Sequence, residues 1–482
     1  MEIQRVSSGI EGLDSAIEGG YPAGTGTLIM GRPGAGKSTF SSHFINEGIR
    51  KNEEVMIVLV GQTSDRYFLD MSRFGFDFEK AEKSGKLIVV NQPIIGSSED
   101  ISSFLRIIDI ADEKKVNRIV IDSFSLLAMQ FKLASEKRRE IMNVIKKLTE
   151  LNRTLVLTLE EAEEGGHYLE EFAVDSVISL DTVKAGDRLR RIVKIEKMRR
   201  TKITDQHLTY KIDKNGVTVF SKETPEFQKE TKSNKVKTGI AGLDQMTAGG
   251  FFESAMTLIS GGSGTGKSIL GMQFIAYGAY NNESCLYVSF EEAKSQLFRN
   301  ASMFGWNFRD YEDKKLLNII TAYPESANIE EHIDVIKRKI EETSTKRVVI
   351  DSISRIEHFF GVDSGNEFVM MLNNIFKKHN VTALYISETY TLIGTTQAIS
   401  DSNISTYMDN IVMLKYVEIQ STIKRSIILL KSRGSDHDKE IREFDIDKKG
   451  VNIKTKFEHA ENILSGSARM TVAEKFASAF KV

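Results

Sequence analysis

Two short stretches decide the fold: GRPGAGKS at residues 31–38 and GGSGTGKS at residues 261–268. Each matches the pattern G-x-x-x-x-G-K-S/T, follows an apolar run and precedes a segment of helical character. In this pattern the glycines let backbone N–H groups converge on phosphate oxygens, and the start of the helix adds positive potential. The lysine reaches the outer phosphates, and the serine hydroxyl holds Mg²⁺. We therefore expect each stretch to bind ATP together with Mg²⁺.

The same set of loop positions is expected to bind ATP in both copies of the pattern. These positions are Gly31, Gly34, Gly36, Lys37, Ser38 and Thr39 in the first copy, and Gly261, Gly264, Thr265, Gly266, Lys267 and Ser268 in the second. Ser38 and Ser268 are also metal-ligand candidates, and Lys267 is a catalytic candidate because it reaches the phosphate that is transferred. A glycine-rich tight turn is the structural alternative, but it does not explain a lysine in both copies.

The two loops belong to an internal repeat. RVSSGIEGLD at residues 5–14 corresponds to KVKTGIAGLD at residues 235–244, and the two loop lysines are likewise 230 residues apart. RIVIDS corresponds to RVVIDS, and YKIDKNGVTVF to FDIDKKGVNIK, at similar separations. Such long self-similarity predicts tandem domains. We place them at residues 1–222 and 236–482, joined by a polar linker at residues 223–235.

Each copy alternates short β-rich runs with helical patterns, as TGTLIM, EVMIVLV, RIVIDS and TLVLTLE illustrate in the first. This alternation is typical of βαβ units, so it predicts an α/β fold with a mostly parallel sheet flanked by helices. RRIVKIEKMR and HLTYKIDKNGVTVF instead predict antiparallel strands with an Asn-Gly turn. These strands would extend one edge of the sheet.

Asp122 and Asp351 each end an apolar strand and are followed by serine. A carboxylate at the C-terminal end of a strand lies at the mouth of an open α/β sheet, where it can hold the water shell of a metal ion. A helix N-cap is the other common role of an Asp-Ser pair. Each aspartate follows its phosphate-binding loop at nearly the same distance, which favours the metal role.

The copies differ where a nucleophile would be activated. Glu291 and Glu292 stand side by side at the end of a strand, and a carboxylate there can orient or deprotonate a nucleophile in line with the γ-phosphate. The corresponding residues of the first copy are Gly61 and Gln62. Loss of a general base lowers the rate by a factor on the order of 10² to 10⁴. We therefore expect the first copy to bind ATP but to turn it over slowly, unless the two glutamates merely solvate a strand end.

The composition excludes several classes of protein. With 482 residues, 40% hydrophobic and 27% charged, the chain can build two or three globular cores. A net charge of -2 provides no overall positive field for nucleic acid. Cys285 is the one cysteine, so neither a disulfide framework nor a cysteine metal site is expected. The chain has neither a signal-peptide pattern nor a long apolar run, so we expect a cytoplasmic protein without a membrane partner.

Longer segments carry a resemblance that covers nearly the whole chain. The diagnostic ones are FEEAKSQLFRNASMFGW, TAYPESANIEEHI, SDSNISTYMDNIVMLKYVE, KSRGSDHDKEIREF and SGSARMTVAEK. With the two loops, they resemble the KaiC family of RecA-like P-loop ATPases, in its double-domain form. The resemblance implies two tandem RecA-like domains and a homohexamer of two stacked rings. It also implies that ATP and Mg²⁺ lie between neighbouring subunits, and that regulatory proteins are further partners.

By the same resemblance, Lys431, Arg433 and His437, with Lys197 and Arg199 of the first copy, would reach the triphosphate of a neighbouring subunit. A strand that carries Lys-x-Arg projects both cations to one face, as charge stabilisation in trans requires. We therefore count Lys431 and Arg433 among the catalytic candidates. A solvated basic strand edge is the alternative.

The resemblance further implies that hydroxyls of the second domain accept the γ-phosphoryl group, which would make the protein a serine/threonine autokinase and autophosphatase. The matching phosphoacceptor positions are Ser405 and Thr406, with Ser400 as a third. The first copy has Glu171 and Phe172 where the two adjacent acceptors would be, so phosphorylation is expected only in the second domain.

Two other functions stay open at this stage. An ATP-gated hexameric scaffold would bind nucleotide without phosphoacceptor chemistry. A RecA-type recombinase would share the loops, but it should carry a basic DNA-binding loop or domain, which the balanced charge does not favour. The final TVAEKFASAFKV is short compared with the tail of the clock proteins, and Gly61 and Gln62 replace a glutamate pair that the family carries in its first domain. We therefore expect a signalling or stress autokinase rather than an oscillator.

Overall fold

The computed structural model describes residues 3–92, 102–128, 134–161, 169–185, 188–203, 205–221, 233–389, 403–419, 422–457, 460–461 and 469–470. The chain divides into two compact units, Met1–Lys222 and Glu223–Val482. Residues 223–232 of the expected linker lie outside the described residues. None of the described helices is long and apolar enough to cross a membrane.

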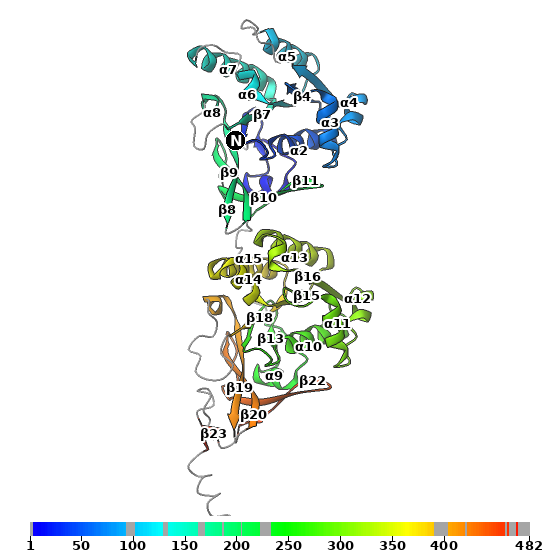
Figure 1. The fold of residues 1–482 in the computed structure, drawn as a ribbon, viewed down its shortest axis with the longest axis vertical. Coiled ribbons are helices and arrows are strands. Elements are labelled where there is room, and N and C mark those ends of the chain that lie inside the picture. Colours follow the sequence, from blue (N-terminus) through cyan, green and yellow to red (C-terminus); the bar gives the residue numbers. More distant parts are fainter. Residues whose placement is uncertain are drawn as a thin grey trace, which may run out of the picture. The chain divides into compact units, whose positions relative to one another are not determined.

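The first unit is built around a nine-stranded sheet with the order β11-β10-β9-β8-β3-β7-β6-β4-β5 (Figure 1). The strands are β3 (Gly26–Gly31), β4 (Val55–Val60), β5 (Leu87–Gln92), β6 (Arg118–Asp122), β7 (Thr154–Glu160), β8 (Ser176–Ala185), β9 (Arg188–Met198), β10 (His207–Asp213) and β11 (Gly216–Phe220). The six strands from β8 to β5 in this order are parallel, whereas β9, β10 and β11 are antiparallel to their neighbours.

Helices connect these strands. They are α1 (Glu11–Ala16), α2 (Lys37–Arg50), α3 (Ser64–Ser72), α4 (Phe78–Lys83), α5 (Ser102–Glu113), α6 (Phe124–Ala128), α7 (Ala134–Thr149) and α8 (Leu169–Ala173). A short 3-10 turn, η1 (Glu150–Asn152), precedes β7, and β1 (Arg5–Val6) pairs with β2 (Tyr21–Pro22).

The second unit repeats this plan, with the order β16-β15-β17-β18-β14-β19-β20-β21-β22. Its strands are β14 (Met256–Gly261), β15 (Cys285–Ser289), β16 (Leu317–Thr321), β17 (Arg347–Asp351), β18 (Thr382–Glu388), β19 (Asn410–Ile419), β20 (Thr422–Ser432), β21 (Arg442–Asp447) and β22 (Gly450–Lys456). Its helices are α9 (Ala241–Met246), α10 (Lys267–Tyr280), α11 (Lys294–Ser302), α12 (Phe308–Asp313), α13 (Ile329–Thr343), α14 (Ile353–Phe360) and α15 (Val362–Lys378). The smaller elements are η2 (Pro324–Ser326), η3 (Asn403–Tyr407), β12 (Lys235–Val236), β13 (Phe251–Phe252), β23 (Ala460–Glu461) and β24 (Arg469–Met470).

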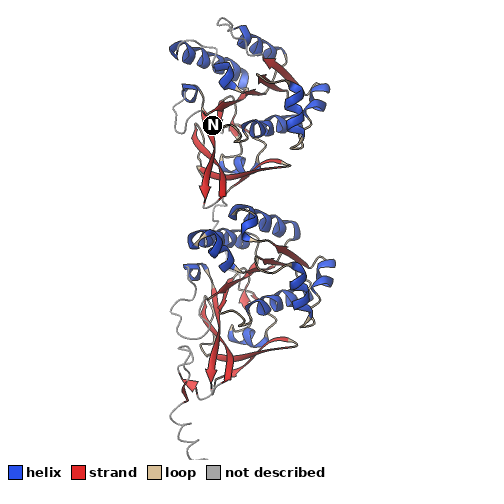
Figure 2. Ribbon diagram, viewed as in Figure 1, coloured by secondary structure: helices blue, strands red, loops and turns tan. Residues whose placement is uncertain are grey.

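The central parallel strands of each sheet are buried on both faces, and each face packs into its own core. Successive side chains of a strand point to opposite faces, so each strand contributes to both cores. Along β4, Val55, Ile57 and Leu59 belong to the core on one face, and Met56 and Val58 belong to the core on the other. Figure 2 shows helices on both sides of each sheet. The prediction of an α/β fold with mostly parallel sheets flanked by helices is therefore confirmed.

The antiparallel edge has the predicted strands, with a small difference in the turn. Asp213 pairs with Gly216, so the two turn residues are Lys214 and Asn215 rather than the Asn-Gly dipeptide itself. Gly216 begins β11 with a φ of 87°, in the left-handed region that glycine adopts without strain. In the second unit Gly450 occupies the same place, with a φ of 110°.

Candidate nucleotide site

The phosphate-binding loop of the second unit joins the C-terminal end of β14 to the start of α10. Gly264 and Gly266 have φ values of 76° and 109°, which turns the chain tightly before the helix begins at Lys267. Lys267 Nζ donates a hydrogen bond of 2.8 Å to the Gly262 carbonyl, and its side chain is buried. Burial lowers the pKa of Lys267, while Glu388 and Asp351 oppose that shift. The Lys267 ammonium group thus lies against the backbone of the loop that would surround a phosphate.

The loop of the first unit has the same geometry. Lys37 Nζ donates to the carbonyls of Gly31 and Arg32 at 2.9 and 3.1 Å. Burial likewise lowers the pKa of Lys37, and the nearby acidic groups, first among them Glu160, oppose the shift. Gly36 precedes α2 in the left-handed conformation. Both loops therefore have backbone and lysine arranged alike.

Each unit has a threonine near its loop lysine, but at a different position, because Thr265 precedes Lys267 by two residues. Thr265 Oγ1 donates to the Gly262 carbonyl at 2.8 Å and is buried within the loop. Thr39 is buried on α2, two residues after the lysine. Ser38 and Ser268 are the second residues of their helices, at the end that faces the loop.

The predicted metal-binding aspartates lie at the C-terminal ends of β6 and β17. Asp351 is buried, and its Oδ2 accepts a hydrogen bond of 2.6 Å from the Tyr287 hydroxyl. Burial raises the pKa of Asp351, and hydrogen bonds from Tyr287 and Ser268 oppose that increase. A carboxylate beside a serine hydroxyl is a set of oxygen ligands suited to Mg²⁺.

The first unit offers a matching observation for a metal ion. Asp122 Oδ1 accepts a hydrogen bond of 2.6 Å from Thr158, but among the described residues its buried Oδ2 has no hydrogen-bond partner. A buried carboxylate oxygen without a partner is costly, and a hydrated cation would satisfy it. The residues present at both sites therefore fit Mg²⁺.

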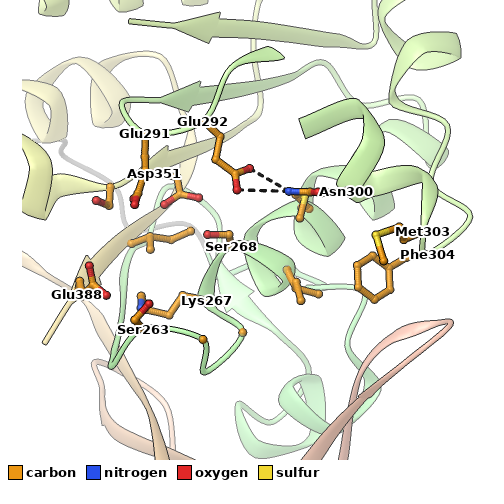
Figure 3. Close-up of a pocket in the computed structure, with 16 residues that line it drawn as sticks. Ser263, Lys267, Ser268, Glu291, Glu292, Asn300, Met303, Phe304, Asp351 and Glu388 are labelled. Carbon is orange, nitrogen blue, oxygen red and sulfur yellow. Dashed lines mark hydrogen bonds between the residues drawn. The ribbon is translucent and has the colours of Figure 1, made fainter. Parts of the chain in front are cut away.

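In the second unit these groups line an open pocket of about 380 Å³ (Figure 3). Its polar side is formed by the loop, Asp351, Glu291, Glu292 and Glu388, while Met303 and other apolar residues line the opposite side. Figure 3 shows Lys267, Ser268 and Asp351 together beneath the two glutamates. The pocket thus combines a phosphate-binding loop, an acidic rim and an apolar wall.

The two glutamates follow β15, and Ser289 Oγ accepts hydrogen bonds from both of their backbone N–H groups, at 3.3 and 2.8 Å. Burial raises the pKa of both carboxyl groups, and the negative charge of Asp351 adds to the increase. A carboxylate with a raised pKa is a better proton acceptor. In the first unit the corresponding Gly61 has a φ of 76° and carries no side chain.

Three residues of this site were missed by the sequence analysis. Glu388 ends β18 directly beside Gly261 and lines the pocket, and Glu160 occupies the same register position in the first unit. An acidic residue that ends the apolar run next to the loop strand was the available signal. Tyr287 and Asn300 had no such signal, because their partners are set by strand register and helix packing.

The predicted in-trans cations and the phosphoacceptors lie together, away from the pocket of their own unit. Lys431 Nζ donates to the Ser405 carbonyl at 3.0 Å, and Arg433 donates to the Thr406 carbonyl at 3.2 Å. None of these residues is among the described residues that line the pocket. Thr406 is exposed, and Ser400 lies outside the described residues.

The corresponding strand of the first unit is held in a similar way. Lys197 Nζ donates to the carbonyls of Glu171 and Val174, at 3.2 and 2.7 Å. Arg199 lies 3.8 Å from Asp175, as Arg433 lies 3.7 Å from Asp409. The remaining cation candidate, His437, is half-buried in the connection between β20 and β21.

Comparisons with known proteins agree with this geometry. A family model described as "ATPase: KaiC" matches residues 6–224 and 236–458. The chain is 34% identical to the circadian clock oscillator protein KaiC of Synechococcus elongatus, over 98% of this chain and 93% of that protein. It is 33% identical to the circadian clock protein KaiC3 of a Synechocystis species, over 97% of this chain and 95% of that protein. The chain therefore belongs to the KaiC family of ATPases, with one ATPase module in each half.

Proposed function

We propose that this protein is an ATP-hydrolysing autokinase in which the second domain transfers the γ-phosphoryl group of ATP to Ser405 and Thr406 of a neighbouring copy. The observation that carries the proposal is the separation of two sets of groups. The loop and the acidic residues form one site, whereas the acceptors and the cations Lys431 and Arg433 share another face. A site of this kind is completed only when one copy presents its acceptor face to the pocket of another.

The chemistry follows from the charges of the two faces. Lys267 and the loop backbone hold the phosphates, and bound Mg²⁺ at Ser268 and Asp351 supplies neutralising positive charge. Glu291 accepts the proton of the attacking hydroxyl as the new O–P bond forms and the bond to ADP breaks. Lys431 and Arg433 of the neighbour stabilise the charge on the transferred group. With water in place of the hydroxyl, the same groups release inorganic phosphate.

The first domain is proposed to bind ATP chiefly as a structural component of the assembly. Its loop, lysine and aspartate have the geometry of the second site, but Gly61 and Gln62 provide no carboxylate after β4. Glu171 and Phe172, which lie in α8 at the positions of the two adjacent acceptors, also lack hydroxyls. By family likeness we propose a hexamer, with regulatory proteins that read the phosphorylation state of the second domain.

Intact-protein mass spectrometry after incubation with Mg-ATP tests the transfer directly. We expect a species heavier by one phosphoryl group, and we expect it to disappear in the Ser405→Ala/Thr406→Ala variant. Glu291→Gln should lower the rate of its formation by a factor on the order of 10² to 10⁴. Assembly with ATP but without any phosphorylated species would instead indicate an ATP-gated scaffold.

A further inference from the structure

The two glutamates of the second site are held differently. Asn300 Nδ2 donates to both carboxylate oxygens of Glu292, at 3.3 and 3.2 Å (Figure 3). Gln296 Nε2 donates to one of the same oxygens at 3.3 Å. Among the described residues, no hydrogen bond reaches the carboxylate of Glu291, which is exposed at the pocket. One glutamate is therefore fixed by a helix and the other is free to turn toward a substrate.

The group that holds the Glu292 carboxylate is the uncharged side-chain amide of Asn300. An amide donates hydrogen bonds without bringing a positive charge, so it fixes the direction of the Glu292 carboxylate without neutralising it. Asn300 is the seventh residue of α11 and lines the pocket, so it joins the helix to the strand end that carries both glutamates. A rotation of Glu292 is thus restricted by the helix, while Glu291 keeps its freedom.

The first unit provides a natural comparison. Gln62 stands where Glu292 stands, and Asp70, the seventh residue of α3, stands where Asn300 stands. The carboxylate and the amide have exchanged places. In the first unit the carboxylate therefore lies on the helix, at Asp70, and the amide follows the strand, at Gln62.

We infer that Asn300 is a positioning residue that anchors Glu292 to α11, and that this anchoring leaves Glu291 as the carboxylate that takes the proton. The inference rests on the proposed function for the identity of the nucleophile and for the role of Glu291 as proton acceptor, and it adds the role of Asn300. Glu292 then shapes the negative rim of the pocket and limits the position of its neighbour. Removal of the amide leaves the Glu292 carboxylate without its donor from the seventh residue of α11, so that it no longer limits the position of Glu291.

The test compares four variants of the full chain by steady-state ATP hydrolysis. Asn300→Asp places a second carboxylate against Glu292, and we expect kcat to fall roughly tenfold to a hundredfold with an unchanged KM. The exchange Glu292→Gln/Asn300→Asp gives these two positions the residues of the first unit and again pairs one amide with one carboxylate. It should recover most of that loss, whereas Glu291→Gln should stay inactive. Asp70→Asn is the matched control in the first domain and should change nothing.

Two outcomes would overturn the inference. If the exchanged pair is as inactive as Glu291→Gln, Glu292 is itself the base. If Asn300→Ala raises KM with kcat unchanged, Asn300 binds nucleotide instead. Binding of a fluorescent ADP analogue and thermal melting establish that each variant is folded, and Asn300→Ala replaces Asn300→Asp if the charged variant fails to fold. Rescue of hydrolysis without phosphate on Ser405 or Thr406 would leave the inference intact and remove the autokinase proposal.

Discussion

At the scale of single residues, the two units use different hydrogen-bond donors to orient the aspartate at the C-terminal end of the same sheet strand. Asp351, the candidate metal ligand of the second unit, accepts a hydrogen bond from a tyrosine of the neighbouring strand, and Asp122 of the first unit accepts one from a threonine of the strand on its other side. Tyr287 and Asp351 are diagonal neighbours, because Ser289 is the residue that pairs with Asp351. Their contact depends on the register between β15 and β17, which cannot be predicted from the sequence.

Tyr287→Phe removes the donor and keeps the ring, so it isolates the hydrogen bond to Asp351. Residues that orient a metal ligand typically contribute tenfold to a hundredfold in metal affinity. We expect the half-saturating Mg²⁺ concentration for nucleotide binding to rise about tenfold, measured by fluorescence titration. Tyr385→Phe is the matched control, because Tyr385 is equally buried but donates to Asn373, away from the site. An equal change in both variants would contradict the assignment.

The loop lysines, the aspartates and the glutamate pair could be predicted to lie near one another from the sequence, because each stands at a fixed place relative to a strand end or a helix start. The contact of Asn300 with Glu292 could not be predicted, because Asn300 lies eight residues after Glu292 on a helix whose rotation is set by packing. Patterns along the chain do not reveal contacts of that kind.

At the scale of elements, the helix after each phosphate-binding loop is hydrogen-bonded to the hairpin at the antiparallel edge of the sheet. These helices are α2 and α10, and their partners are β11 and β22. His43 Nε2 accepts from the Val217 N–H at 2.8 Å, and in the second unit Gln273 Oε1 accepts from the Val451 N–H at the same distance. The glycine before each donor is required, since a Cβ at Gly216 would lie 2.4 Å from His43 Nε2. The repeat predicted the helix and the hairpin, but not that they are joined.

His43 makes the hydrogen bond between α2 and the hairpin sensitive to pH. Burial lowers the pKa of His43 to about 4, below the ordinary value of 6.5. At a pH between these two values His43 is protonated in the unfolded chain but neutral in the folded domain. The first domain therefore loses stability as the pH falls from about 6.5 to about 4. The full shift corresponds to about 3 kcal/mol.

We expect His43→Gln to remove this loss by giving the first unit the amide that the second already has. Hydrogen exchange of the α2 amides at several pH values, corrected for the intrinsic rate, measures the opening free energy. Gln273→His in the second unit is the reciprocal variant and should create the same acid sensitivity in α10. Identical pH dependence of wild type and His43→Gln would refute the explanation.

A buried arginine ties three elements together in each unit. Arg347 donates to both carboxylate oxygens of Glu283 and to the Lys237 carbonyl, and it lies over the ring of Phe274. Arg118 makes the corresponding contacts in the first unit. These bonds connect the N-terminal segment, the loop helix and a central strand.

Arg347→Met should therefore destabilise the second unit by about 3 kcal/mol, because backbone and carboxylate acceptors lose their donors. Denaturant unfolding of the full chain measures the effect. Arg347→Lys keeps the charge but not the forked geometry, so we expect it to recover only part of the loss. Full recovery by lysine would show that charge alone is sufficient.

At the scale of the whole molecule, the repeat has kept one fold in two units while its chemistry diverged. Loops, aspartates and cationic strands correspond in position, but the Glu291–Glu292 pair and the hydroxyls proposed as acceptors occur only in the second half. The duplication and the α/β sheets could be predicted, because long self-similarity and alternating patterns are properties of the chain itself. The grouping of Lys431 and Arg433 with Ser405 and Thr406 could be expected only through family likeness.

The two loop lysines should consequently have separable effects. We expect Lys267→Ala to abolish phosphorylation of the second domain. Lys37→Ala should chiefly weaken nucleotide binding by the first domain and the association of copies. Analytical ultracentrifugation with ATP, combined with phosphate release, distinguishes the two variants. Equal loss of turnover in assembled Lys37→Ala protein would contradict the proposed division between the domains.

The hydrogen bonds of Lys431 and Arg433 to the backbone around Ser405 and Thr406 bear on how copies would come together. Long cationic side chains normally lose rotational freedom when they meet a partner, at a cost of about 0.5–1.5 kcal/mol each. Here both are already immobilised before any second copy arrives. Docking would therefore forfeit little entropy at these residues, and the arriving phosphate would have to compete with two carbonyl oxygens for the same donors.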